Sequence, residues 1–166
     1  MENLPLPLHL LLHFVLAVLA GWLVGRRFDK TALGIVAGIL GGFFIDLDHV
    51  LEYFLVLGPH FNIVYFLEGR QYLTSSQVHS WFHAWEYVPP LLFLVWLLRK
   101  HVAGAVFVLA LTLGGAVHLA TDSVVNQYPV RNYSLIYRWR SNFAVEKLLN
   151  PAQYREFMED KAHFDL

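Results

Sequence analysis

The chain has no cysteine among its 166 residues, so it forms no disulfide and offers no thiolate to a metal. Charged side chains are also scarce, at 15% of the residues, whereas hydrophobic residues make up 57%. This balance is far from that of an ordinary soluble domain and favours a membrane protein. The net charge is only -1, so we expect no nucleic acid among the partners. Any metal site must use nitrogen and oxygen ligands.

Four hydrophobic segments are each long enough to cross the hydrocarbon core, which needs about 20 helical residues. They cover residues 6–25, 32–58, 78–98 and 102–125. We predict an all-α fold, an integral membrane bundle of four transmembrane helices that forms a metal-binding domain over residues 1–143. A C-terminal amphipathic tail follows over residues 144–166. In the third segment, Pro89 and Pro90 remove two backbone donors, and we expect them to kink that helix.

The remaining segments are predicted to lie outside the hydrocarbon core. Residues 59–77 carry aromatic side chains with few charges and should form an interfacial loop. Residues 126–143 interleave tyrosine and tryptophan with arginine, a composition typical of the headgroup level. Asn150 followed by Pro151 predicts the start of a short, soluble C-terminal helix.

Ionisable side chains interrupt the hydrophobic segments, and such groups at membrane depth usually mark a functional site. If the segments alternate in direction, the first and third begin on the side where the second and fourth end. The ionisable side chains fall near these ends in every case: His9, His13, Asp46, Asp48, His49, Glu52, His79, His83, Glu86, His118 and Asp122. All four segments are therefore predicted to contribute to one polar layer near a single membrane face.

The spacing of these residues also favours a shared metal site. Three pairs of the predicted ligands are three or four residues apart and so project from one helix face: Asp46 with His49, His83 with Glu86, and His118 with Asp122. Asp48 points away from Asp46 on an ideal helix. To share the site it needs a local distortion of the helix; otherwise it binds a second ion or hydrogen-bonds to a metal ligand. The predicted ligands are His13, Asp46, Asp48, His49, His83, Glu86, His118 and Asp122, with His9, His79 and Glu52 as weaker candidates.

Structural roles compete with metal binding at several of these positions. A single histidine such as His13 is equally well explained as a packed or snorkelling side chain. His118 and Asp122 have a structural hydrogen bond as their alternative. Asp46, Asp48 and His49, late in the second segment, are harder to explain in this way. Three titratable groups so close together are destabilising in an apolar helix without partners or metal. Arg131 and Arg138 are either interface anchors or phosphate-binding groups.

Four motifs follow one another along the chain: His13, GGFFIDLDH at residues 41–49, FHAWE at 82–86 and HLATD at 118–122. In this order they resemble the membrane-bound metal-dependent hydrolases, a family similar to zinc-dependent phospholipase C and P1 nuclease. The resemblance implies an all-helical metal centre that hydrolyses phosphoester bonds, with the eight predicted ligands at the matching positions. The chain departs from the family at Ile45, where proline is usual, and it lacks the His-Arg-Gly motif of many members.

The leading hypothesis is a membrane-embedded hydrolase that cleaves a phospholipid or another lipid phosphate at the interface. The ligand types suit Zn²⁺, with Mn²⁺ as the alternative, as one or two ions. Asp46, Asp48 and Glu86 are the candidates for catalysis, because one carboxylate can bridge two ions and another can accept a proton from water. Arg131 and Arg138 are the candidates for binding the phosphate.

Two other functions are compatible with the same residues. A metal or proton transporter also uses intramembrane acids and histidines, but it needs polar groups through the full membrane thickness. The other half of each hydrophobic segment offers almost none. The second alternative is a noncatalytic membrane scaffold in which the metal only stabilises the bundle.

Basic residues predict the orientation in the membrane. They follow the first and third segments, at Arg26, Arg27, Lys30, Arg99 and Lys100. By the positive-inside tendency these loops are cytoplasmic, which makes the chain a multi-pass inner-membrane protein with its metal site on the extracytoplasmic side. The bias is small, because arginines also follow the fourth segment.

Overall fold

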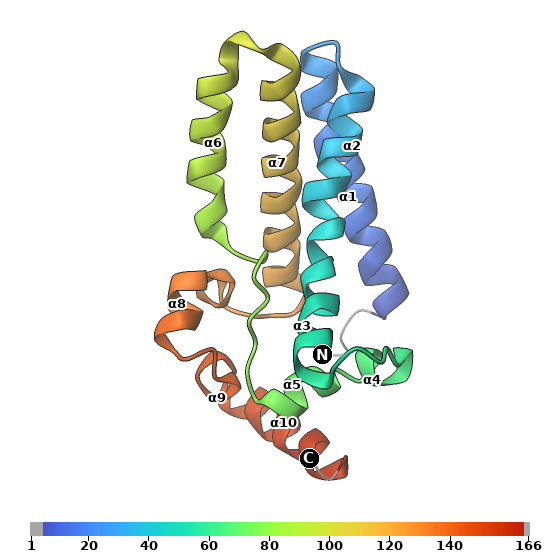
Figure 1. Ribbon diagram of the computed structural model, residues 1–166, viewed down its shortest axis with the longest axis vertical. Helices are drawn as coiled ribbons and strands as arrows, with labels where there is room; N and C mark the ends of the chain where they lie inside the picture. The colour runs from blue at the N-terminus through green and yellow to red at the C-terminus, as the bar shows by residue number, and fades with distance from the viewer. Residues whose placement is uncertain (1–4, 165–166) are drawn as a thin grey trace. The chain divides into compact units, whose positions relative to one another are not determined.

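The computed structural model describes residues 5–164, and their regular structure is helical apart from one isolated bridge between Gln77 and Ala144 (Figure 1). The all-α prediction is therefore confirmed. The longer helices are α1 (Leu6–Arg27), α2 (Thr31–Gly42), α3 (Leu47–Leu57), α6 (Val88–Leu97), α7 (Val102–Val125) and α10 (Pro151–His163). The short ones are η1 (Phe44–Asp46), α4 (Ile63–Leu67), α5 (Arg70–Ser75), η2 (Trp85–Tyr87), η3 (Leu98–Lys100), η4 (Val130–Tyr133), α8 (Leu135–Arg140) and α9 (Val145–Leu148).

Three helical stretches are long and apolar enough to cross a membrane: Leu6–Arg27, Thr31–Leu57 and Val102–Val125. The first, second and fourth predicted segments therefore correspond to membrane-length helices. Many large hydrophobic side chains on the surface are exposed, such as Leu23 at 58% and Phe93 at 59%. Exposure on this scale is unusual in water and is expected against lipid, so the chain is a membrane protein.

The third predicted segment differs from the prediction. Residues 78–84 are not helical, and α6 begins only at Val88 and has 10 residues. The prediction of a helix from residue 78 is therefore wrong. The expected kink is also wrong, because Pro89 and Pro90 lie in the first turn of α6, where a helix needs no N–H donors.

The chain divides into two compact units. The first unit contains Met1–Ile45 and His83–Tyr133, and the second contains Asp46–Phe82 and Ser134–Leu166. The predicted tail, residues 144–166, belongs to the second unit, and the domain boundary at residue 143 stays a prediction.

Close helix packing forms the core of the first unit. Helices α1, α2 and α7 pack against one another, and α6 packs against α7 (Figure 1). Glycines permit the short distances: a Cβ atom on Gly38 would come within 2.7 Å of the Cα atom of Gly21. A Cβ on Gly42 would lie 2.8 Å from the carbonyl oxygen of Gly114. Small residues at such crossings let backbones approach, as is typical of transmembrane helix pairs.

The second unit is built around α5, which contacts α3, α4 and α10. The backbone N–H of Val78 donates to the carbonyl of Phe143 at 2.9 Å, which joins two segments that are distant in sequence. Asn150 caps α10 through a capping box, and Pro151 is its first residue, so the predicted C-terminal helix is confirmed. Two short helices, α4 and α5, occupy the predicted interfacial loop.

Candidate metal centre

Four histidines and one aspartate converge inside the first unit. His9 and His13 lie one turn apart on α1, His118 and Asp122 lie one turn apart on α7, and His83 lies in the segment before η2. His13, His83 and His118 are almost completely buried, and Asp122 is 5% exposed. Helices α1 and α7 contact each other, and the start of α1 lies beside the end of α7.

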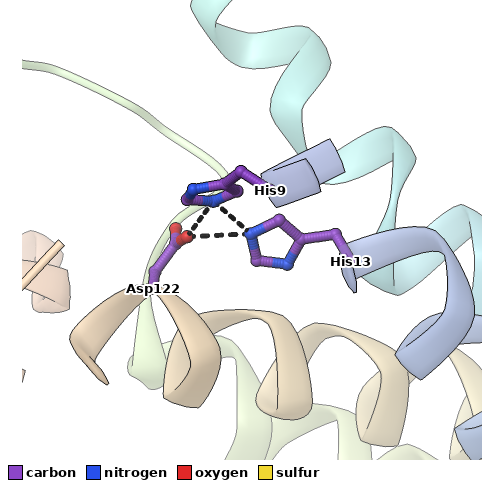
Figure 2. Close-up of side chains that lie close together, drawn as sticks. All are labelled: His9, His13 and Asp122. Atoms are coloured by element: carbon purple, nitrogen blue, oxygen red, sulfur yellow. Dashed lines mark hydrogen bonds and ion pairs between the residues drawn. The ribbon is translucent and has the colours of Figure 1, made fainter. Parts of the chain in front are cut away.

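One oxygen of Asp122 faces the pair from α1. The Nε2 atoms of His9 and His13 lie 3.2 Å and 3.0 Å from Oδ1, and they are 2.6 Å from each other (Figure 2). Both rings therefore point their Nε2 atoms at the same carboxylate oxygen from one side.

The other oxygen of Asp122 faces the second pair. His118 Nε2 lies 3.2 Å from Oδ2 and His83 Nε2 lies 3.7 Å from it. The two Nε2 atoms are 3.0 Å apart. Asp122 thus lies between two histidine pairs and uses one oxygen for each.

The main chain of α2 fixes the orientation of His118. Its Nδ1 lies 3.0 Å from the carbonyl oxygen of Gly42, which can only accept, so Nδ1 carries a proton and donates it. In the neutral ring, Nε2 then has a lone pair that points at Asp122 and His83. The ring of His13 stacks on that of His118 with centroids 3.9 Å apart. A backbone acceptor behind a histidine is a common way to orient a metal ligand.

The chemistry of these donors fits a cation. A lone pair of His118 that faces a carboxylate oxygen is repulsive unless a positive charge lies between them. Nitrogen ligands about 2.0–2.1 Å from a tetrahedral zinc are about 3.3 Å apart, close to the separation of His83 and His118. Two groups of three ligands have their donor atoms within 4.8 Å of one another in this unit, and both include Asp122. The cluster can therefore hold a metal ion.

Of the predicted ligands, the cluster contains His13, His83, His118 and Asp122, together with the weaker candidate His9. The spacing of four residues between His9 and His13, which puts both on one helix face, is a sequence signal that could have ranked His9 higher. Glu86 lies on η2, is partly buried and is not among the groups of converging ligand atoms found in the described residues.

Asp46, Asp48 and His49 lie at the junction of η1 and α3, in the second unit. His49 Nε2 lies 3.6 Å from Asp46 Oδ1, and His49 Nδ1 lies 3.6 Å from Asp48 Oδ1. The turn of 3₁₀-helix at η1 is the kind of local distortion that Asp48 was expected to need. The role of these three residues as ligands stays a prediction.

Asp48 and Glu52 also hold a segment of main chain, which the sequence did not indicate. Asp48 Oδ2 accepts from the N–H of Phe82 at 2.8 Å. Glu52 accepts from the N–H groups of His79 at 2.7 Å and Ser80 at 3.1 Å. His79 Nδ1 is also 3.1 Å from Glu52, so this weaker candidate ligand is oriented by a carboxylate. These acids therefore shape the loop that carries His79.

Tyr72 on α5 is a further polar contact of the second unit that the sequence did not single out. Its hydroxyl lies 2.6 Å from His49 Nδ1. Burial raises the pKa of the Tyr72 phenol well above its ordinary value, and the charges of Glu52 and Asp48 raise it further. The hydroxyl therefore stays protonated and is available to orient His49.

The two predicted phosphate-binding arginines differ in exposure. Arg138 on α8 is 2% exposed, and its Nη2 donates to the carbonyl of Ser80 at 2.9 Å. Arg131 on η4 is exposed. Arg138 thus supports the same loop as Glu52, and its predicted contact with phosphate stays a prediction.

No protein-family model, curated protein or solved structure matches the chain. The fold and the cluster define the class on their own: a helical membrane protein with a buried group of imidazoles and a carboxylate that can hold a metal ion. The resemblance to the metal-dependent hydrolases stays a prediction from the motifs.

Proposed function

We propose that this chain is a membrane-embedded, metal-dependent hydrolase that acts on a phosphoester at the membrane interface. The observation that supports the proposal is the convergence of two histidine pairs on the two oxygens of Asp122. A purely structural carboxylate needs one or two donors, whereas four imidazoles around one acid are typical of a metal centre.

The donor set favours Zn²⁺, with Mn²⁺ as the alternative, as one or two ions. A divalent ion held there would polarise a phosphoryl oxygen and make a nearby water more acidic. Asp122 would supply one oxygen to an ion at either histidine pair, while the Gly42 carbonyl keeps His118 in the correct tautomer. Glu86, which belongs to the same unit, is the candidate base, and Asp46 and Asp48 remain candidates from the sequence motifs.

The substrate class follows from where the cluster lies in the helices. Asp122 is three residues from the end of α7, and His9 is three residues from the start of α1, which suits a substrate presented at the headgroup level. A phospholipid or another lipid phosphate has this position. Arg131, which belongs to the same unit as the cluster, is the proposed phosphate-binding group, and Arg138 remains a candidate from the sequence.

The proposal includes four crossings of an inner membrane with the metal centre on the extracytoplasmic side. The proposed fourth crossing runs from residue 83 to residue 100, and its helices α6 and η3 give about 20 Å at about 1.5 Å per residue. Helix η2 and the non-helical residues His83 and Ala84 precede them. His83 and Ala84 are both 2% exposed, and irregular backbone is tolerated at membrane depth when protein covers it.

The test compares Asp122→Asn with Asp29→Asn. Asp29 lies in the turn between α1 and α2 at φ 54°, a conformation that asparagine adopts readily, so it is a matched loss of one carboxylate. Elemental analysis of purified protein should find about one or two divalent ions per chain in the wild type and in Asp29→Asn. Asp122→Asn should retain less than a tenth of that metal, because it loses the shared anionic ligand.

Turnover is measured on the same samples with phosphatidylglycerol, phosphatidylcholine and phosphatidic acid. Hydrolysis should disappear in Asp122→Asn and after chelation, and return when Zn²⁺ is restored to the wild type. A pure, folded protein that binds no divalent metal contradicts the proposal. Metal-loaded protein without turnover supports the scaffold, and metal flux into vesicles without turnover supports a transporter.

A further inference from the structure

The first unit contains an apolar pocket of about 160 Å³ that the proposed function does not use. Val95 and Arg99 line it from the end of α6 and from η3, and Val102, Ala105 and Val106 line it from the first turns of α7. Phe28, which follows α1, and Leu109 on α7 also line it. Apart from the guanidinium of Arg99, these side chains offer no hydrogen bond.

This pocket is separate from the cluster of histidines around Asp122. Along α7, Ala105 and Asp122 are 17 residues apart, which is about 25 Å at 1.5 Å per residue. The connection from α6 to α7 and the connection from α1 to α2 lie at the same end of the first unit, at the top of Figure 1. The residues that line the pocket lie toward this end, and the cluster lies toward the other end of α7.

Positive charge gathers in the same two connections. Together with the last turn of α1, they contain Arg26, Arg27, Lys30, Arg99 and Lys100 against a single acid, Asp29. The guanidinium of Arg99 lies 4.5 Å from the ring centre of Trp96, and that of Arg26 lies 5.0 Å from the ring of Trp22. Paired arginine and tryptophan at the ends of apolar helices are typical of the headgroup level, where anionic lipids are attracted to basic residues.

We propose that this pocket binds an acyl chain of an anionic membrane phospholipid whose phosphate contacts Arg99 and Lys100. An apolar cavity of about 150 Å³ is large enough for benzene and excludes water, so this pocket suits several methylene groups rather than solvent. The surrounding cations select the charge of the headgroup. The inference concerns a second site and does not depend on hydrolysis.

The first arm of the test uses the wild-type protein, delipidated in detergent. Mixed micelles with palmitoyl-oleoyl phosphatidylglycerol are compared with micelles of palmitoyl-oleoyl phosphatidylcholine, which has the same chains and no net charge. Unfolding is followed by the fluorescence of the five tryptophans. The anionic lipid should raise the midpoint by roughly 3 °C more than the neutral lipid, because it binds the folded state.

The second arm uses matched variants. Ala105→Leu fills the pocket, whereas Ala103→Leu adds the same side chain at an exposed position of α7 outside the lining. Arg99→Gln removes the lining cation, and Arg26→Gln removes an equal charge at the same end. The difference between the two lipids in the rise of the unfolding midpoint should fall by more than half in Ala105→Leu and Arg99→Gln. It should persist in Ala103→Leu and Arg26→Gln.

Each of the following outcomes would overturn the inference. The first is an equal shift with both lipids. The second is a shift that survives Ala105→Leu, and the third is an equal loss in Arg99→Gln and Arg26→Gln, which indicates diffuse charge attraction. A change of oligomeric state in Ala105→Leu with no lipid effect would assign the pocket to a second copy of the chain instead.

Discussion

Two buried carboxylates of this chain have contrasting surroundings. Asp122 faces imidazole nitrogens, whose lone pairs can hold a metal. Glu52 has a single imidazole beside it, that of His79, and accepts from two peptide N–H groups, which can only donate. Burial alone therefore does not identify a ligand, since Glu52 is 1% exposed and Asp122 is 5% exposed. The type of neighbouring donor separates the metal candidate from the structural acceptor.

We expect Glu52→Gln to lower the free energy of unfolding by about 1–3 kcal/mol. Glutamine keeps one acceptor oxygen, but its NH₂ group cannot accept a hydrogen bond. One of the two N–H groups, that of His79 or that of Ser80, therefore loses its acceptor. Urea unfolding in detergent measures the loss. Glu68→Gln is the control, because Glu68 is paired with Arg70 on the surface and its removal should cost less than about 1 kcal/mol. Equal losses in the two variants would contradict this account.

At the residue level, the sequence indicated His13, His83, His118 and Asp122, because ionisable groups in apolar helices are conspicuous. It did not indicate the partners of Glu52, since these lie more than 25 residues away in an irregular loop. Nearly every residue has the same backbone N–H and carbonyl groups, so residue type does not predict hydrogen bonds to them. For the same reason the sequence did not predict that the carbonyl of Gly42 accepts from His118.

At the level of the helices, close backbone contacts at glycine residues position the histidines around Asp122. The crossing of α1 and α2 brings Gly21 and Gly38 together. The contact between α1 and α7 sets the distance from His13 to Asp122. A methyl group inserted at one crossing should therefore disturb both stability and the cluster.

We expect Gly38→Ala to destabilise the protein by about 1–3 kcal/mol, because its Cβ atom would collide with the backbone of α1. Gly104→Ala is the matched control: its Cβ would meet only the two methyl groups of Leu98, at 3.5 Å and 3.9 Å. There the exchange should stabilise α7 by up to about 1 kcal/mol. Thermal unfolding in detergent measures both, and effects of the same sign would count against the packing argument.

Hydrophobic length predicted α1 and α7 closely, because a long apolar run has no alternative to a helix in a bilayer. The same reasoning failed at residues 78–84, where apolar composition accompanies an irregular loop. Hydrophobicity reports burial or lipid contact, not hydrogen bonding. Pro89 and Pro90 were given the wrong role, since proline in the first turn starts a helix and deeper inside it breaks one.

At the scale of the whole molecule, the absence of native cysteine permits a clean test of topology. We expect Phe28→Cys to react with a membrane-impermeant maleimide only after the cells are opened, because the basic connection is proposed to be cytoplasmic. Thr74→Cys, on α5, should react in intact cells. Both native side chains are exposed. The opposite pattern would invert the proposed orientation while leaving the metal cluster untouched.

Because Asp122 offers one oxygen to each histidine pair, the two pairs could not bind cations independently. A cation beside Oδ1 would withdraw electron density from Oδ2, so occupancy of one pair would weaken the ligand available to the other. Linkage would make the effect reciprocal: each of two ions would lower the affinity for the other by the same factor. In a two-ion centre, the shared carboxylate would therefore hold a first ion tightly and a second more loosely.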